Sequence, residues 1–409
     1  MRILFLAHRL PYPPNKGEKI RAFWELRALS EHNDVDLFCF YVEKDEKKSI
    51  SDIRNYCRSC YAEQLSPLSA RSRALTALLR KKAFSPAFFR SPEMARHVSH
   101  ALSSRSYDAV FVFGSAMAQY AEHWSNGIKV LDLVDVDSDK WFQYSNQKGG
   151  LLRSLWKREG KQLAEYERRL VSSFDHTLIC TEAEAQLLRS IAPIGAIHTF
   201  ENCLDLDFYD PESTVIPDSL RTLQPYVVFT GSMNYFPNID AVEYFVREIF
   251  PFVRAQVPKL SLVVAGRNPV PEVKALCKQA GVHITGTVAD IRPYLKGAAA
   301  AIAPMRVARG VQNKILEALA MNTSVVASTK SAAALSPQLR AMVEAVPNAQ
   351  AFADRLIDIL RQPSRKRPDS RSVLQDYFDS LNLQFRFVSF FQGTAMARAN
   401  TDGRIAVAI

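Results

Sequence analysis

The stretch Ala303–Ser328, which reads APMRVARGVQNKILEALAMNTSVVAS, decides the fold class of this chain. An apolar run ends here in a basic loop with Arg306 and Arg309, and Gly310 follows the loop. In VQNKILEALAM the apolar residues recur at spacings of three and four, which predicts one buried face of a helix. The next run, SVVAS, predicts a strand. Strand, loop, helix and strand in this order form the repeating unit of a parallel α/β sheet.

The loop before this predicted helix is suited to an anion. Gly310 stands where the helix begins, so free backbone N–H groups and the positive charge of the loop meet at one point. Lys314 and Glu317 follow one turn apart, on the side that we expect to face away from the apolar stripe. A cation and a carboxylate near one helix N-terminus suit a ligand that carries both phosphate and sugar hydroxyls.

The alternation of strands and helices extends outward from this stretch. From Pro225 to residue 328, strands and amphipathic helices alternate regularly, which predicts a doubly wound α/β domain. A similar unit opens the chain, with a buried strand at 2–7, a proline-rich loop, a helix at 19–32 that Gly17 precedes, and a strand at 34–42. We therefore predict two Rossmann-like domains with a cleft between the carboxyl ends of their parallel sheets.

The predicted boundary lies in the polar, proline-bearing segment 201–213. It gives an N-terminal domain of residues 1–200, a C-terminal domain of residues 201–393 and a tail at 394–409. The last helices of the second domain are candidates to return to the first.

Length and composition agree with this division. A chain of 409 residues is too long for one ordinary core, and 47% hydrophobic with 23% charged residues is typical of a globular protein. The formal net charge of +10 favours anionic partners such as nucleotides, phosphates, nucleic acid or an anionic membrane surface. A basic balance of this size can also serve solubility alone.

Neither the cysteines nor the N-terminus indicates export. The six cysteines are scattered, and several lie in apolar runs, which is typical of cytosolic proteins rather than of a disulfide framework. The N-terminal run MRILFLAHRL lacks the shape of a signal peptide, and no stretch approaches the ~20 apolar residues that span a bilayer. We expect a cytoplasmic protein.

The segment 71–90, RSRALTALLRKKAFSPAFFR, mixes basic with apolar residues and has no acidic residue. This pattern is typical of an element that lies on an anionic membrane surface, which would make the protein peripheral on the inner face of the cell membrane. The docking residues would be Arg80, Lys81, Lys82, Phe88 and Phe89. An ordinary helix with a solvated basic face explains the pattern equally well.

Residues that follow the strands of the predicted second domain would meet at one edge of its sheet and form a site for an anionic ligand. They are Gly231, Ser232, Gly266, Arg267, Arg306, Arg309 and Gly310, with Lys314 on the next helix. Arginine forks and lysine charges are the usual partners of a diphosphate, so Arg267, Arg309 and Lys314 predict a nucleotide diphosphate. Glu317 can accept hydrogen bonds from the ribose hydroxyls. No GxxxxGK[ST] loop and no GxGxxG after a strand is present.

In the first predicted domain, Asp135 and Asp137 follow the strand-like run IKVLDLV. They either face the predicted cleft or cap the helix that follows. The sequence Asp135-Val136-Asp137 has the spelling of a metal-binding DxD motif, but we predict neither a metal nor another cofactor.

Several strings, spread over nearly the whole chain, carry a resemblance to a known family. They are PYPPNKGEKIRAFWELRAL (11–29), LVDVDSDKW (133–141), TEAEAQLL (181–188), ENCLDLDFY (201–209), VVFTGSMNYFPNIDAVEYF (227–245), LSLVVAGRNP (260–269), ITGTVADIRPYL (284–295) and the opening stretch. The chain resembles GT-B fold glycosyltransferases of the retaining family 4 type. LVDVDSDKW and RGVQNKILEALAM (309–321) are similar, more closely, to the sugar transferases associated with exosortase (PEP-CTERM) exopolysaccharide systems.

This resemblance implies a retaining, metal-independent hexosyltransferase that moves a sugar from a nucleotide sugar to a lipid-linked saccharide in polysaccharide synthesis. The N-terminal domain would bind the acceptor and the C-terminal domain the nucleotide sugar. In the family, the residue at Glu317 hydrogen-bonds the ribose, and the glycine at Gly310 lets the helix approach the diphosphate. Gly17 would lie near the donor phosphates, and Asp135 and Asp137 would orient the acceptor or the sugar. Catalysis would rest mainly on stabilising the departing diphosphate.

The sequence departs from the family pattern at Arg309, where the family has a glutamate that contacts the transferred sugar. Arginine cannot accept hydrogen bonds, so Arg309 would hold a phosphate or a carboxylated sugar instead. Many relatives have a histidine near the position of Asp135, and His8 is the nearest candidate here. Three alternatives stay open: a nucleotide-sugar epimerase, which needs no acceptor, a degenerate transferase that acts as an assembly partner, and nucleic-acid binding. The last is least favoured because no recognised nucleic-acid module is present.

Overall fold

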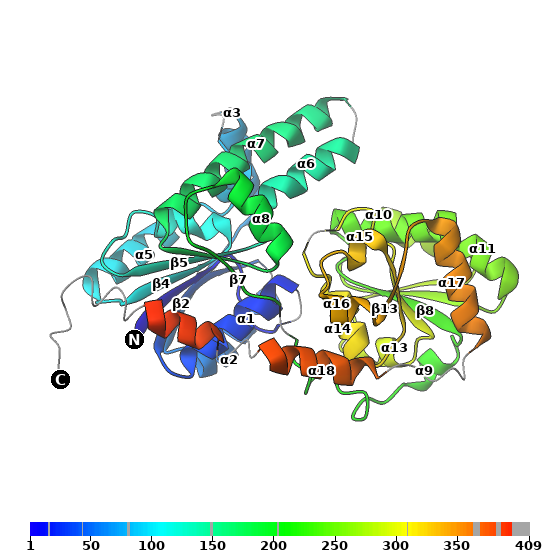
Figure 1. Cartoon of the computed structure of the whole chain (residues 1–409). Helices are drawn as coiled ribbons and strands as arrows, with labels where there is room; N and C mark the ends of the chain where they lie inside the picture. Colours follow the sequence, from blue (N-terminus) through cyan, green and yellow to red (C-terminus); the bar gives the residue numbers. More distant parts are fainter. Residues whose placement is uncertain are drawn as a thin grey trace. The chain divides into compact units, whose positions relative to one another are not determined.

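The computed structural model describes residues 1–14, 17–42, 44–79, 82–147, 150–202, 204–308, 310–362, 369–381 and 386–394. The chain forms two compact units. The first comprises Met1–Cys203 and Asn382–Ile409, and the second comprises Leu204–Leu381. Both units alternate helices with parallel strands (Figure 1).

The first unit is built on a sheet of seven parallel strands in the order β3-β2-β1-β4-β5-β6-β7. Their bounds are β1 Arg2–Ala7, β2 Asp34–Tyr41, β3 Ser59–Gln64, β4 Ala109–Phe113, β5 Ile128–Val134, β6 His176–Ile179 and β7 Ile197–Thr199. The central strands β1 and β4 are almost wholly buried, as expected for a parallel sheet that is covered on both faces.

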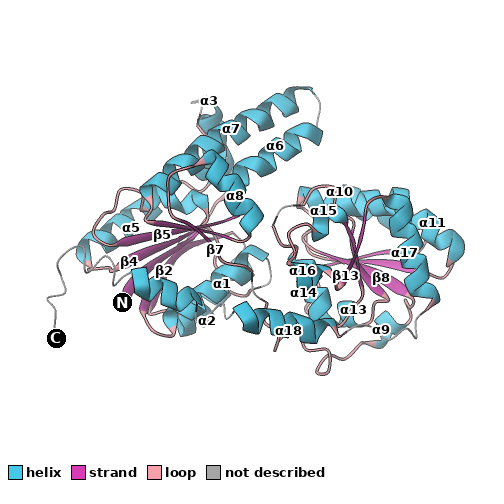
Figure 2. Ribbon diagram, in the orientation of Figure 1, coloured by secondary structure: helices cyan, strands magenta, loops and turns pink. Residues whose placement is uncertain are grey.

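Helices cover both faces of this sheet (Figure 2). They are α1 Gly17–Ser30, α2 Ser49–Ile53, α3 Pro67–Leu79, α4 Phe84–Phe88, α5 Pro92–Ser104, α6 Asp137–Gln147, α7 Gly150–Ser173, α8 Glu182–Ile191 and a helix at 386–394. Apolar side chains of α5, α7 and α8 share one core cluster with Leu4 and Leu6, whereas α1 and the helix at 386–394 share another with Ile3 and Phe5. Because side chains alternate along β1, the two sets reach opposite faces.

The second unit has six parallel strands in the order β10-β9-β8-β11-β12-β13. Their bounds are β8 Tyr226–Thr230, β9 Ser261–Ala265, β10 Val282–Gly286, β11 Ala300–Ala303, β12 Val325–Ser328 and β13 Val343–Val346. The helices are α9 Asp218–Arg221, α10 Phe236–Tyr244, α11 Phe250–Gln256, α12 Pro271–Ala275, α13 Arg292–Lys296, α14 Asn313–Ala320, α15 Thr329–Ala332, α16 Pro337–Arg340, α17 Ala349–Arg361 and α18 Ser370–Leu381. Helices α10, α11 and α17 pack on one face of the sheet, and α13, α14 and α18 on the other.

In each sheet the strand order reverses beside the first strand of the unit. The neighbours at this point are β1 and β4 in the first sheet, and β8 and β11 in the second. The connections leave such a switch point toward opposite faces, so a crevice opens beyond the carboxyl ends of the strands, where α/β proteins bind ligands. The residues directly after β1, β4, β8 and β11 therefore define the candidate sites.

The predicted fold class of two parallel α/β units is confirmed, and the opening stretch forms β11, the loop, α14 and β12 in the predicted order. The segment 71–90, predicted as one amphipathic element, divides instead between α3 and α4. Within the part of the chain that the structure describes, no helix is both long and apolar enough to cross a membrane.

Candidate functional site

Lys314 lies at the switch point of the second sheet and is held by neutral groups. Its Nζ donates to Asn238 Oδ1 at 2.7 Å and lies 3.7 Å from Met305 Sδ and 4.1 Å from the centroid of the Phe229 ring. Phe229 belongs to β8, Met305 follows β11, and Asn238 comes from α10. Lys314 is not among the buried residues of α14, which agrees with the expectation that it faces away from the apolar stripe. Its long apolar stem extends over the carboxyl end of β8, where the ring offers a favourable face to the cation.

Burial and a nearby carboxylate govern the electrostatics of Lys314. Burial lowers the pKa of Lys314 to about 7, against the opposing effect of the negative charge of Glu317. Burial raises the pKa of Glu317, although the Tyr209 hydroxyl donates to its carboxylate and Lys314 adds positive charge nearby. Among the residues described, every polar partner of Lys314 is uncharged. A ligand that carries negative charge would therefore meet a cation with no carboxylate in direct contact.

Two glycines allow the loops at this edge to approach each other closely. A Cβ at Gly231, whose φ is 149°, would lie 2.6 Å from Asn238 Nδ2, and one at Gly266 would lie 1.7 Å from the Gly231 carbonyl oxygen. Asn238 Nδ2 donates to the Ser232 carbonyl at 3.0 Å, which turns the amide oxygen toward Lys314. Glycine at positions 231 and 266 is thus a steric requirement of the site.

Of the predicted donor residues, the structure brings Gly231, Ser232, Arg267 and Lys314 together. Arg267 Nε donates to Ser232 Oγ at 3.3 Å, and the Arg267 carbonyl accepts the Met233 N–H at 2.9 Å. This arrangement places a guanidinium at the end of β9, directly beside the loop that follows β8.

The N-terminal end of α14 lies beside this group. Gly310 has a φ of 56°, a left-handed conformation that glycine adopts without strain, and Gln312 precedes the helix without a capping hydrogen bond from its side chain. Arg309 lies outside the described residues. Arg306 is engaged elsewhere, since its Nε donates to Asp240 Oδ2 at 3.0 Å and its guanidinium lies 5.0 Å from the Tyr244 ring centroid.

Two residues of this site were not predicted from the sequence. The sequence placed Asn238 at the end of a loop over residues 232–238, and Tyr209 in a connection between domains. Tyr209 is 6% exposed, its pKa is raised by burial and by the charge of Glu317, and its hydroxyl donates to that carboxylate. No local pattern marks either residue, because each acquires its role from a partner more than 70 positions away.

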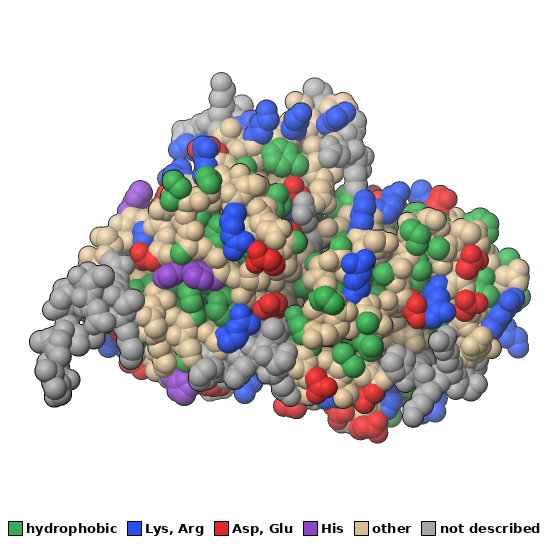
Figure 3. All heavy atoms as spheres, in the orientation of Figure 1, with side chains coloured by type: hydrophobic (Ala, Val, Ile, Leu, Met, Phe, Trp, Pro, Cys, Tyr) green, Lys and Arg blue, Asp and Glu red, His purple; other side chains and the backbone are tan. Residues whose placement is uncertain are grey.

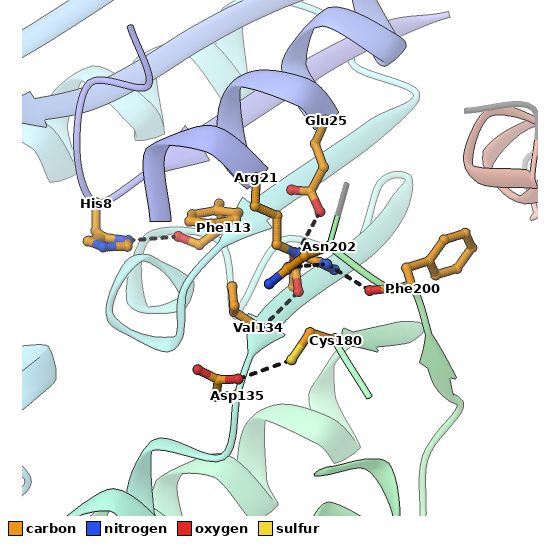
Figure 4. A network of polar contacts seen from close by, with 10 residues as sticks. His8, Arg21, Glu25, Phe113, Val134, Asp135, Cys180, Phe200 and Asn202 are labelled. Atoms are coloured by element: carbon orange, nitrogen blue, oxygen red, sulfur yellow. Dashed lines mark hydrogen bonds and ion pairs between the residues drawn. The ribbon is translucent and has the colours of Figure 1, made fainter. Parts of the chain in front are cut away.

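In the first unit, the structure places Asp135 and Asp137 at the carboxyl end of β5. Asp135 Oδ1 accepts the Cys180 thiol at 3.0 Å, as Figure 4 shows, and Asp135 Oδ2 pairs with Lys140 Nζ at 3.1 Å. Asp137 opens α6 and accepts from the same ammonium at 2.9 Å. Although burial opposes ionisation of Asp135, Lys140 and the Cys180 thiol hold its pKa below the usual value. Asp135 is therefore suited to accept hydrogen bonds rather than to take up a proton.

His8 and Gly17 lie near the switch point of the first sheet. Gly17 opens α1 after the loop that follows β1. The His8 ring stacks on Phe113 with centroids 5.8 Å apart, and His8 Nδ1 lies 3.4 Å from the Phe113 carbonyl oxygen (Figure 4). Gly114, with a φ of 85°, follows β4, and a Cβ there would lie 2.8 Å from His8 Nδ1. The structure thus joins the loops after β1 and β4 through His8.

The membrane-docking prediction needs a correction at Phe88 and Phe89. Both pack against the core of the first unit, and the Phe89 ring lies 5.4 Å from His8 and 6.2 Å from Phe40. Aromatic side chains with buried neighbours of this kind are not free to enter a lipid surface. Arg80 and Lys81 lie outside the described residues, and Lys82 is exposed.

Other apolar side chains are exposed on the same part of the first unit. Leu68 and Leu75 of α3 are 78% and 62% exposed, and Leu152 of α7 is 52% exposed. Figure 3 shows Lys and Arg side chains gathered over the hairpin of α6 and α7. The described residues contain no group of three or more His, Cys, Asp or Glu side chains that could hold a metal ion.

Comparison with known proteins connects this geometry to a class of enzymes. Residues 224–362 match the family model Glyco_trans_1_4, described as glycosyl transferases group 1. An uncharacterised 44.6 kDa protein in the cps region of Klebsiella pneumoniae is 22% identical over 346 residues, which cover 80% of this chain and 82% of that protein.

Solved structures of other proteins are similar to almost the whole of this chain. The sucrose-phosphate synthase of Thermosynechococcus elongatus matches with a TM-score of 0.71 and 16% identity, covering 97% of this chain and 100% of that one. HepE of Anabaena in complex with UDP-glucose matches with a TM-score of 0.65 and 13% identity, covering 96% and 100%. The chain therefore has the GT-B fold, and the glycosyl transferases group 1 model matches within its second unit. Lys314, Glu317, Arg267 and Gly231 all lie within the matched residues.

Proposed function

We propose that this protein is a glycosyltransferase that moves a sugar from a nucleotide-sugar donor to a saccharide acceptor. One observation carries this proposal: among the described residues, Lys314, inside the matched glycosyltransferase group 1 region, has only uncharged hydrogen-bond partners at the β8/β11 switch point. Burial disfavours the ammonium form of Lys314, and the charge of Glu317 offsets this only in part, so the negative charge of a bound diphosphate would stabilise it. The HepE structure, in which a protein of the same fold holds UDP-glucose, supports a nucleotide sugar as the ligand.

Each donor residue has a part in this proposal. The diphosphate lies against Lys314, Arg267 and the backbone N–H groups at Gly310, with the N-terminus of α14 adding its dipole. Glu317, one turn along α14, accepts hydrogen bonds from the ribose hydroxyls, and Tyr209 holds its carboxylate in place. The glycines at 231 and 266 leave room for backbone and ligand to approach.

We further propose that transfer proceeds with retention of configuration and without a metal ion. The bond between the anomeric carbon and the diphosphate oxygen breaks, and the acceptor oxygen bonds to the anomeric carbon on the same face. The proton of the acceptor hydroxyl passes to the departing diphosphate. Stabilising that leaving group is then the main catalytic task, and Lys314 with Arg267 performs it.

The acceptor side of the proposal belongs to the first unit. The Asp135 carboxylate, with Asp137 beside it, accepts a hydrogen bond from a hydroxyl of the sugar or of the acceptor saccharide and so orients that hydroxyl. The relative in a cps region supports a role in polysaccharide synthesis, and we propose a lipid-linked saccharide as the acceptor. The exposed leucines of α3 and α7 with the surrounding basic side chains would dock the protein, peripheral and cytoplasmic, on an anionic membrane.

The experiment that tests the donor site combines a thermal shift with a transfer assay. UDP-glucose, UDP-N-acetylglucosamine and GDP-mannose are screened for a rise in melting temperature, because a ligand that binds the native state stabilises it. K314A and E317A should lose both the shift and the transfer while their unliganded melting temperatures stay close to that of the wild type. K278A, at an exposed lysine of the same unit, should retain both. Unchanged turnover in E317A would refute the assignment of the site.

A further inference from the structure

We propose that Asp132 and Arg21 are positioning residues that hold Val134 in a left-handed conformation and thereby present Asp135 at the carboxyl end of β5. The inference rests on the proposed function only for the role of Asp135 in transfer. The contacts themselves form one network that joins β5, α1 and the end of the first unit's sheet (Figure 4).

The backbone at Val134 is in an unusual conformation. Val134 has a φ of 67°, which a β-branched side chain rarely adopts. The Asp135 N–H donates to the Leu133 carbonyl at 2.8 Å, which closes a three-residue γ-turn centred on Val134. A γ-turn with positive φ at its centre is rare and strained. The surrounding structure must therefore hold it.

The pairing of β5 with the neighbouring strand β6 is irregular at the same residues. The pairing of β5 with β6 shifts in register between Asp132 and Val134, so Leu133 has no partner in the ladder. Beyond the shift, the Cys180 N–H donates to the Val134 carbonyl at 2.9 Å. Extra residues of this kind re-aim the side chains that follow them, and here the residue that follows is Asp135.

Asp132 supplies the direct restraint. Its Oδ1 accepts the Val134 N–H at 2.8 Å, and its Oδ2 accepts from Arg21 Nε at 2.6 Å. The carboxylate is fully buried, so both oxygens depend on these partners. Asp132 thus spans the turn on its own strand and is anchored from α1.

Arg21 supplies the anchor. It is buried, its Nη1 donates to the Phe200 carbonyl at 2.7 Å and to Asn202 Oδ1 at 3.1 Å, and Glu25 lies 3.1 Å from its Nε. Burial and the neighbouring Asp132 raise the pKa of Glu25 well above its usual value. Two carboxyl groups and one guanidinium then make a cluster in which Asp132 makes the shorter contact with Arg21 Nε, at 2.6 Å.

The geometry gives the network a function beyond stability. Asp135 directs one oxygen to the Cys180 thiol and the other to Lys140, and both contacts require the turn at Val134. If the restraint from Asp132 is lost, Val134 relaxes to a negative φ and the Asp135 carboxylate moves away from these partners. A displacement of about 1 Å in a group that orients a reactant costs roughly 100-fold in rate.

The test is a double-mutant cycle in the full-length protein, measured as UDP release from UDP-glucose. D132N keeps the shape of the side chain, but its Nδ2 cannot accept a hydrogen bond, so the contacts with Arg21 and Val134 cannot both persist in this geometry. We expect kcat to fall by roughly 10–100-fold with little change in KM for UDP-glucose. Because Asp132 acts through Asp135, D132N/D135N should be no slower than D135N. If D132N lowers kcat by the same factor in D135N as in the wild type, the proposal is wrong.

Asp36 offers a matched control for the loss of a buried aspartate. It is fully buried in β2 and accepts from Arg105 at 3.0 Å and from Tyr107 at 2.8 Å, away from the turn. D36N should lower the melting temperature as D132N does, yet keep the kcat of the wild type. If D36N lowers kcat as much as D132N, the effect of D132N is structural and the inference fails.

Hydrogen exchange decides the question without any substrate. In D132N, the peptide that contains Val134 and Asp135 should exchange faster than in the wild type, while D36N leaves that peptide unchanged. Unchanged exchange in D132N would contradict the restraint. If the wild type releases no UDP from any donor, the proposed function fails, but the exchange result still stands. A rescue of the D132N rate in D132N/V134G is expected, because glycine adopts the left-handed turn without strain.

Discussion

Lys314 Nζ and Asn238 Oδ1 lie 2.7 Å apart, although the two residues are 76 positions apart in the chain. The amide of Asn238 is turned by its bond to the Ser232 carbonyl, and Gly231 leaves space for it. The only described groups in contact with the ammonium are this amide, a thioether and an aromatic ring. A lysine kept in this setting is poised for an anionic ligand.

The variant N238D tests whether the uncharged surroundings of the Lys314 ammonium matter for binding an anion. A carboxylate at position 238 would pair with the ammonium, raise the pKa of Lys314 and compete with a diphosphate for it. We expect UDP to bind about 10–100-fold more weakly, measured by isothermal titration calorimetry. N238A, which removes the amide without adding charge, should weaken binding less. Equal affinity of N238D and the wild type would show that the diphosphate binds elsewhere.

The proton of Lys314 should couple binding to pH. The pKa of Lys314 in the folded protein is about 7, well below the ordinary value of 10.5. Bound diphosphate favours the ammonium form, so the affinity for UDP should fall by up to about tenfold per pH unit as the pH rises above about 7. Calorimetry in buffers of different ionisation enthalpy should show proton uptake on binding at pH 8. K314M should bind weakly and show no uptake.

The same shift predicts how the unliganded protein responds to pH. Between pH 7 and 10.5 the unfolded chain binds more protons at this lysine than the folded protein does. The contribution of Lys314 to stability therefore rises with pH across this window and is absent in K314M. The measurement is the difference in melting temperature between wild type and K314M at pH 6.5 and pH 9. A difference that moves in the opposite direction would contradict the assigned burial.

Tyr209 should act on donor affinity through Glu317. Y209F removes the hydroxyl that donates to the buried carboxylate, which raises the pKa of Glu317 further and loosens its orientation. We expect KM for the donor to rise by about 3–10-fold, which corresponds to the loss of one hydrogen bond, with kcat nearly unchanged. Y294F, at a partly buried tyrosine of the same unit, serves as control. An unchanged KM in Y209F would separate Tyr209 from the donor site.

The membrane proposal predicts binding that depends on both charge and apolar contact. The wild type should sediment with vesicles that contain phosphatidylglycerol at low salt and be released at high salt, because screening weakens contacts between exposed charges. L68S/L75S should bind less at every salt concentration, since it removes exposed leucines of α3 without altering charge. Equal sedimentation with neutral vesicles, or no effect of L68S/L75S, would count against docking through α3.

Several features of the fold could be predicted from local sequence. The spacing of Ile315, Leu316 and Leu319 predicts the buried face of α14, and Gly310 predicts where the chain turns into it. The runs at 2–7 and 225–231 predict the first strand of each sheet, which the structure has at Arg2–Ala7 and Tyr226–Thr230. These predictions succeed because helix and strand periodicity depend only on neighbouring residues.

The environment of a side chain was harder to predict. Lys314 lies off the buried side of α14, as expected, but its contacts with Asn238 and Phe229 could not be predicted. Phe88 and Phe89 were expected at a membrane, although they pack on the core. A lysine or an aromatic residue is amphipathic enough to take either position. The choice depends on which distant strand lies beneath it.

The sequence by itself determined the class of this protein: parallel α/β units, a basic glycine loop before a helix, and a carboxylate one turn further on. Only the tertiary structure decided which groups share a site. The Lys314 contact with Asn238, the Tyr209 bond to Glu317 and the Asp132 restraint on Val134 all depend on it. The reason is physical. Local periodicity selects helices and strands, whereas the partners of a buried charge are set by the order in which the strands assemble.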